Sequence, residues 1–147
     1  MMSKKIIIIN GPNLNLLGQR EDDIYGKDSL DQIKSKCEIK GKELGIKISF
    51  YQSNNEGEII NKIHELSNLY DGLIINPAAF THSSIAILDS LRAIKKPKIE
   101  IHLSNIYSRE EYRKKSITSE GVHGLICGFG GNSYLLGIEA ICKLIYK

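Results

Sequence analysis

The feature that most constrains the fold is a row of four isoleucines at positions 6–9, followed at once by Asn10, Gly11 and Pro12. A continuous β-branched run of this kind is typical of a strand buried on both faces of a parallel sheet. Comparable short apolar runs recur at 46–51, 73–75, 99–103 and 122–127. The chain therefore has five candidate strands, and the first needs hydrophobic cover on both sides.

Helical patterns fill the segments between these runs. Ser29 and Gln32 have the spacing of a capping box and Gly45 is a natural stop, so a helix is predicted over 29–45. Other helices are expected over 57–69, over 83–94, in a short stretch capped by Ser108, and over 133–146. Parallel strands need crossovers, which cover both faces of the sheet. We therefore predict one domain over 1–147 with a flavodoxin-like, doubly wound, five-stranded parallel sheet in three α/β/α layers.

The composition limits the partners and the compartment. The formal net charge is +3, from 20 Lys and Arg against 17 Asp and Glu, which argues against a nucleic-acid partner. Three cysteines without a Cys-x-x-Cys pair suggest neither a disulfide framework nor a zinc site, and fit a reducing, cytoplasmic location. The isoleucine run is too short to span a membrane and lacks the marks of a secretory signal, so we expect no membrane association.

Polar residues mark the ends of the predicted strands, where open parallel sheets bind ligands. The first apolar run ends at Asn10 and the third at Asn76. In the fourth, alternation places Glu100 and His102 on one face of the strand. Buried charges need a partner or a ligand. Taken alone, a structural hydrogen-bonded pair explains these two residues equally well.

Two further segments point to the same edge. The stretch 10–26 is far longer than a usual connection of about two to six residues, contains Arg20 and Tyr25, and is typical of an active-site lid. Arg109 and Arg113 are four residues apart, which on a helix places them on one face, suited to clamping a carboxylate. Taken alone, these arginines fit a solvated helix face better.

Longer motifs carry a specific resemblance. They are Asn-Gly-Pro-Asn-Leu-Asn-Leu-Leu-Gly at 10–18, Gln-Ser-Asn-Asn-Glu-Gly-Glu at 52–58, Asn-Pro-Ala-Ala-Phe-Thr-His at 76–82, Glu-Ile-His-Leu-Ser-Asn at 100–105 and Arg-Glu-Glu-Tyr-Arg at 109–113. In this order the chain resembles the type II 3-dehydroquinate dehydratases over essentially its whole length. The resemblance implies anti elimination of water from 3-dehydroquinate, through an enolate, to give 3-dehydroshikimate for aromatic amino acid biosynthesis. It implies no metal or other cofactor.

The resemblance also implies residue roles. Tyr25 is the base that takes the C2 proton, and His102 is the acid that protonates the departing hydroxyl. Arg20 favours the tyrosinate, Asn13 helps to stabilise the enolate, and Glu100 orients His102. A free phenol has a pKa of about 10, so a tyrosine base needs such a cation nearby. The substrate-binding residues implied are Asn76, His82, Asp89, Leu103, Ser104 and Arg113.

The resemblance also implies an assembly, and the chain departs from the family pattern at one place. Family members are dodecamers built from four trimers, in which the residue matching Asp89 reaches a neighbouring subunit's site. Asp22 and Asp23 occupy a part of the lid where the family often has proline, and we expect both to face solvent.

The alternative is a non-enzymatic flavodoxin-like module. A phosphoacceptor receiver needs acidic residues at the end of the first strand, where residues 10–13 are not acidic. A flavin or dinucleotide site is weakly indicated, because Gly128-Phe-Gly130 follows the last strand and not the first.

Overall fold

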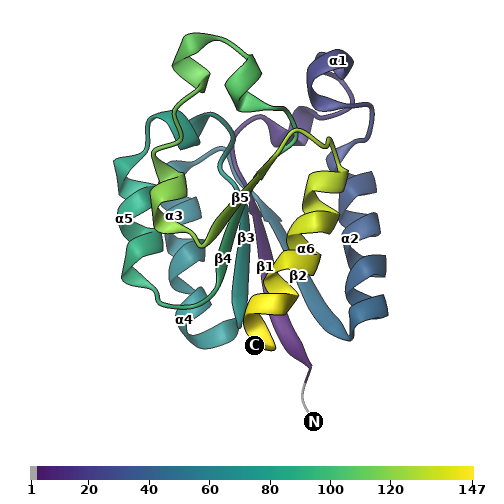
Figure 1. Cartoon of the computed structure of the whole chain (residues 1–147), viewed down its shortest axis with the longest axis vertical. Helices are drawn as coiled ribbons and strands as arrows, with labels where there is room; N and C mark the ends of the chain where they lie inside the picture. The colour runs from purple at the N-terminus through teal and green to yellow at the C-terminus, as the bar shows by residue number, and fades with distance from the viewer. Residues whose placement is uncertain (1–2) are drawn as a thin grey trace.

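Five parallel strands form one sheet in the order β2-β1-β3-β4-β5, with helices on both faces (Figure 1). The computed structural model describes residues 3–147. The strands are β1 (Lys4–Asn10), β2 (Ile46–Gln52), β3 (Gly72–Asn76), β4 (Lys98–His102) and β5 (Gly124–Cys127). This confirms the predicted doubly wound, flavodoxin-like arrangement. The strand order reverses between β1 and β3, which is where such sheets open a crevice at their carboxyl edge.

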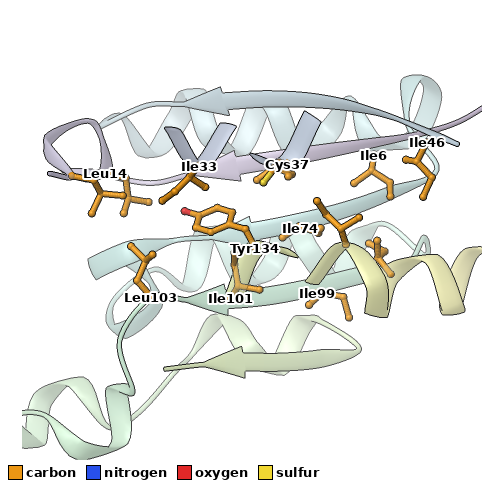
Figure 2. Close-up of a cluster of buried hydrophobic side chains, with 14 residues drawn as sticks. Ile6, Leu14, Ile33, Cys37, Ile46, Ile74, Ile99, Ile101, Leu103 and Tyr134 are labelled. Atoms are coloured by element: carbon orange, nitrogen blue, oxygen red, sulfur yellow. The ribbon is translucent and has the colours of Figure 1, made fainter. Parts of the chain in front are cut away.

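The isoleucines of β1 explain why the sheet is covered on both sides. Ile6 and Ile8 pack in a cluster with α2 (Leu30–Leu44) and α6 (Asn132–Ile145), part of which is drawn in Figure 2. Ile7 and Ile9 pack on the opposite face, against α3 (Glu56–His64), α4 (Leu66–Leu69) and α5 (Ile85–Ala93). All four side chains are fully buried. Alternation along one strand therefore supplies both halves of the core.

The ends of the first long helix follow the predicted signals. The Ser29 hydroxyl accepts from the backbone N–H of Gln32, and the Gln32 side chain accepts from the backbone N–H of Ser29, as a capping box requires. Gly45 ends α2 in the left-handed region, at φ 70°. The helix predicted over 57–69 is instead two helices, because a tight turn at Glu65 separates α3 from α4.

The short helix predicted from Ser108 is wrong. The chain forms two separate 3-10 turns, η3 (Ile106–Ser108) and η4 (Glu111–Arg113). Asn105 is the cap, since its side-chain oxygen accepts from the backbone N–H of Tyr107, while the Ser108 hydroxyl donates to the Asn105 carbonyl. Arg109 lies after the first turn and Arg113 in the second, so the two arginines do not share a helix face.

Candidate active site

A pocket lies at the carboxyl edge of the sheet, with about 550 Å³ of empty space in and around it, open solvent included. It brings together nine of the predicted site residues, namely Asn13, Arg20, Tyr25, Asn76, His82, His102, Leu103, Ser104 and Arg113. Arg109 lines it as well. Within residues 3–147, no Asp or Glu is among the lining side chains, so three guanidinium groups face a space without a lining carboxylate. Such a surface attracts an anionic ligand.

Tyr25 ends the short helix α1 (Asp22–Tyr25) on the predicted lid segment, and its phenol oxygen has two cationic partners. It accepts hydrogen bonds from Arg20 Nη2 at 3.2 Å and from Arg109 Nη2 at 2.9 Å. The Cζ atoms of these arginines lie 4.3 Å and 5.0 Å from the centre of the tyrosine ring. The phenol oxygen therefore lies beside two positive charges and accepts a charge-assisted hydrogen bond from each.

Arg109 has a different partner from the one that the sequence pattern predicted. It was grouped with Arg113 as a carboxylate clamp, whereas in the fold it reaches a tyrosine 84 residues away in the chain. A second hydrogen bond, from Arg109 Nη1 to Ser104 Oγ at 3.2 Å, fixes the orientation of the guanidinium group. Arg109 Nε is buried and, in the described part of the chain, is the one such side-chain atom without a hydrogen-bond partner, although Glu110 Oε1 lies 3.7 Å away as an ion-pair partner.

His102 and Glu100 occupy the end of β4 as a hydrogen-bonded pair. His102 Nε2 lies 2.8 Å from Glu100 Oε2, which leaves Nδ1 as the ring nitrogen available to a ligand. His102 lines the pocket, and Glu100 lies behind it with no exposed surface. The predicted pairing of these two residues on one strand face therefore matches the structure.

Three hydroxyl groups complete the surroundings of Glu100. Thr81 and Ser116 donate to Oε2 at 2.8 Å and 2.7 Å, and Thr118 donates to Oε1 at 2.5 Å. Burial by itself raises the pKa of Glu100, but the hydrogen bond and charge of His102 and the hydrogen bonds from Thr118 and Ser116 outweigh burial and hold that pKa below its ordinary value. Nothing in the sequence interpretation singled out these hydroxyls, because they come from segments outside β4.

The remaining lining groups are also held by local contacts. The His82 ring donates from Nδ1 to the Lys115 carbonyl at 2.8 Å, and burial lowers the pKa of this histidine despite that bond. Arg113 Nε donates to Glu110 at 2.7 Å, and hydrogen bonds from Tyr112 and Arg113 lower the pKa of Glu110 to about 2. Arg113 is thus oriented by a carboxylate outside the pocket.

Two predicted positions lie elsewhere. Asp89 is exposed on α5 and does not line the pocket of its own chain. Asp22 and Asp23 are exposed on α1, so the expectation that they face solvent is confirmed.

Two kinds of feature are absent from residues 3–147. No group of three or more His, Cys, Asp or Glu side chains is arranged to hold a metal ion. No helix in the same range is both long enough and apolar enough to cross a membrane.

Comparison with known proteins identifies relatives along nearly the whole chain. The family model described as dehydroquinase class II matches residues 4–142. A 3-dehydroquinate dehydratase of Clostridium botulinum is 56% identical over 142 residues, covering 97% of each chain. One from Geotalea daltonii is 48% identical, covering 97% of this chain and 99% of its own. The crystal structure of a type II dehydroquinase from Butyrivibrio crossotus superposes with a TM-score of 0.93 at 43% identity, covering 95% of this chain and 98% of that chain.

Proposed function

The chain belongs to the dehydroquinase class II family, and from that membership we propose how its own residues perform the reaction. The protein is a hydro-lyase that removes water from 3-dehydroquinate to give 3-dehydroshikimate, a step of the shikimate pathway. The observation that carries the residue assignment is the phenol oxygen of Tyr25, held by two arginines in the pocket that His102 also lines.

Tyr25 is the base in this proposal. Its phenolate takes the proton from C2 of the substrate, and the electron pair of the broken C–H bond becomes an enolate. A free phenol is ionised to only about one part in a thousand at neutral pH, equivalent to roughly 4 kcal/mol. Charge-assisted hydrogen bonds from Arg20 and Arg109 act against this cost because such bonds strengthen when their acceptor becomes an anion.

His102 is the acid. Its Nδ1 donates a proton to the C1 hydroxyl, which leaves as water while the enolate collapses to the C1–C2 double bond. Glu100, which is held as a carboxylate by its hydroxyl donors, accepts from Nε2 and keeps Nδ1 available to the substrate. After the reaction the Tyr25 oxygen carries the proton from C2, and His102 has lost one. Before the next turnover Tyr25 releases its proton to solvent and His102 takes one up.

The substrate is an anion with several hydroxyls, and the lining matches it. Arg113 is the cation for the carboxylate, assisted by the backbone amides of Leu103 and Ser104. Asn76 and His82 bind hydroxyls, and His82 does so through Nε2 because Nδ1 is occupied. Asn13 stabilises the enolate oxygen, and its left-handed backbone at φ 69° turns the chain at the end of β1.

We further propose a homo-oligomer, a dodecamer of four trimers, in which Asp89 acts on a neighbouring site. One observation supports the role of Asp89: its carboxylate is exposed on α5 and does not line the pocket of its own chain. A cytoplasmic location is inferred from the three free cysteines.

Replacing Tyr25 by phenylalanine tests the base. Tyr25→Phe keeps the ring and removes the oxygen, so we expect kcat to fall by about 10²-fold to 10⁴-fold. Turnover is followed by the absorbance of the enone product, and circular dichroism confirms the fold. Tyr107→Phe, an exposed tyrosine outside the pocket, is the control. Wild-type turnover by Tyr25→Phe would exclude Tyr25 as the base.

A further inference from the structure

A buried chain of hydrogen bonds runs behind the pocket, from β3 through α6 to β1. Asn76 Nδ2 donates to the Tyr134 phenol oxygen at 3.0 Å, and the Tyr134 hydroxyl donates to Asn10 Oδ1 at 2.6 Å. Tyr134 and Asn10 have no exposed surface, and Asn76 is 2% exposed. In Figure 2 the Tyr134 hydroxyl points toward the end of the sheet where Leu14 and Leu103 lie. A phenylalanine would fill the same space, so the hydroxyl itself needs an explanation.

The direction of this chain is set at its far end. Asn10 Nδ2 donates to the backbone carbonyl of Tyr51 at 3.0 Å. Turning the Asn10 amide over would set its oxygen against that carbonyl, so Oδ1 must face Tyr134. The single phenolic proton is thereby committed to Asn10, and the Tyr134 oxygen can only accept from Asn76.

A second contact fixes the same orientation of Asn76. Its Oδ1 accepts from the backbone N–H of Ala78 at 3.1 Å, in a turn where Ala78 has φ 52°. One N–H of the Asn76 amide is used by Tyr134, and the side chain also lines the pocket. The second N–H is therefore left for a ligand.

We propose that Tyr134 is a positioning residue that holds the Asn76 amide with an N–H directed to the pocket, so that the pocket selects a hydrogen-bond acceptor, such as a hydroxyl oxygen, at this point. The inference rests on the proposed role of Asn76 in substrate binding. Tyr134 touches no substrate and acts only through Asn76. Without its oxygen, the Asn76 amide loses one of the two contacts that orient it.

Tyr134→Phe in the full-length enzyme tests this. We expect KM to rise about threefold to tenfold, the effect of one weakened hydrogen bond, with kcat and its pH profile unchanged. Ile138→Val is the matched control, since Ile138 is fully buried on the same helix and in the same cluster. Ile138→Val removes a methyl group from the same core, so we expect it to lower the thermal stability of the enzyme and to leave KM unchanged.

A double variant separates the two proposals. Asn76→Ala raises KM, and adding Tyr134→Phe to it raises KM no further, because the amide that Tyr134 positions is gone. If Asn76→Ala raises KM but Tyr134→Phe does not, or if the two effects multiply, the role of Tyr134 is overturned while that of Asn76 stands. If Asn76→Ala leaves KM unchanged, the binding role of Asn76 fails, and the selection inferred through Tyr134 fails with it.

Hydrogen exchange of the Asn76 side-chain amide gives a readout independent of turnover. In the wild-type enzyme the N–H bonded to Tyr134 is expected to exchange slowly, and in Tyr134→Phe the same N–H is expected to exchange at least about tenfold faster. Fast exchange in the wild type overturns the proposal even if Tyr134→Phe fails to fold.

Discussion

The phenol oxygen of Tyr25 lies between two arginines that differ in how firmly they are held. Arg20 is on the same lid segment, five residues away, whereas Arg109 is anchored by Ser104 at the end of β4. A donor that is already in place when charge develops costs no reorganisation during the reaction. Arg109 should therefore contribute to the stability of the phenolate even though the lid carries the base.

Arg109→Lys tests this at the residue scale. Lysine keeps the charge but lacks the planar fork that reaches Ser104 and Tyr25 together. We expect kcat to fall by about 10²-fold to 10³-fold, the usual effect of losing one preorganised donor. Arg92→Lys, whose exposed side chain pairs with Glu120 outside the pocket, should leave kcat unchanged in the same assay. A wild-type kcat for Arg109→Lys would mean that Arg20 alone supports Tyr25.

The buried carboxylate of Glu100 predicts a pH-dependent stability. Its pKa is lowered in the folded state, so its stabilising contribution is complete above the unfolded value of about 4.3 and is lost as the pH falls through the lower folded value. We expect the thermal midpoint of the wild type to exceed that of Glu100→Gln at neutral pH, and the difference to shrink below about pH 4. Thermal unfolding from pH 3 to 7 measures it, with exposed Glu111→Gln as control. A difference that is constant with pH would contradict the lowered pKa.

At the scale of elements, α2 and β2 approach each other at a glycine. A Cβ added at Gly41 would lie 2.6 Å from Ile48 Cγ1 and 2.8 Å from the Ile46 carbonyl oxygen. Alanine is a better helix former than glycine by about 1 kcal/mol, which alone favours the substitution. Overpacking costs about 1–3 kcal/mol, and the backbone oxygen cannot move as a side chain can. The cost of overpacking should therefore exceed the gain in helix propensity, so the substitution should be destabilising.

Gly41→Ala is accordingly expected to lower the free energy of unfolding by about 1–2 kcal/mol. Urea unfolding followed by circular dichroism measures this, with Lys42→Ala at the exposed neighbouring position as control. A more stable Gly41→Ala would show that α2 can shift away from β2 at little cost.

At the scale of the whole molecule, the proposed oligomer predicts complementation between two defective chains. Tyr25→Phe lacks the base, and Asp89→Ala lacks the carboxylate assigned to a neighbouring site. Co-expressed, they should form mixed oligomers in which some sites combine an intact Tyr25 with an intact Asp89. We expect the mixture to exceed the activity of either variant alone. Activity no greater than the average of the two would place Asp89 outside the neighbour's site, and sedimentation gives the oligomeric state directly.

Long-range charge is a property of the whole pocket wall. Three arginines and no lining carboxylate, within residues 3–147, should draw in the anionic substrate. The Debye length falls from about 10 Å at 0.1 M salt to about 3 Å at 1 M. KM should therefore rise with salt while kcat changes little. A KM that is independent of salt would mean that short-range contacts alone hold the carboxylate.

Particular residues show which features of the fold and the site can be predicted from the sequence. The isoleucines of β1, the capping box at Ser29 and the stop at Gly45 were predicted correctly, because each depends on neighbours within a few positions. Ser108 was assigned wrongly as a helix cap, because Asn105 takes that place a few residues earlier. The near partners, Arg20 of Tyr25 and His102 of Glu100, were expected. The distant ones could not be predicted, since Thr118 lies 18 residues from Glu100 and Arg109 lies 84 residues from Tyr25 along the chain.

The sequence by itself determined the alternation of strands and helices, the two-sided burial of β1 and the family of the chain, because these follow from local periodicity and from motifs in a fixed order. Only the tertiary structure decided that a second cation, Arg109, meets Tyr25, what keeps Glu100 charged and how the amide of Asn76 is turned. Those contacts join side chains that are distant in the sequence and that packing brings within about 3 Å of one another. Hydrogen bonds need this short distance and a suitable angle, and the backbone positions set by the whole fold determine both.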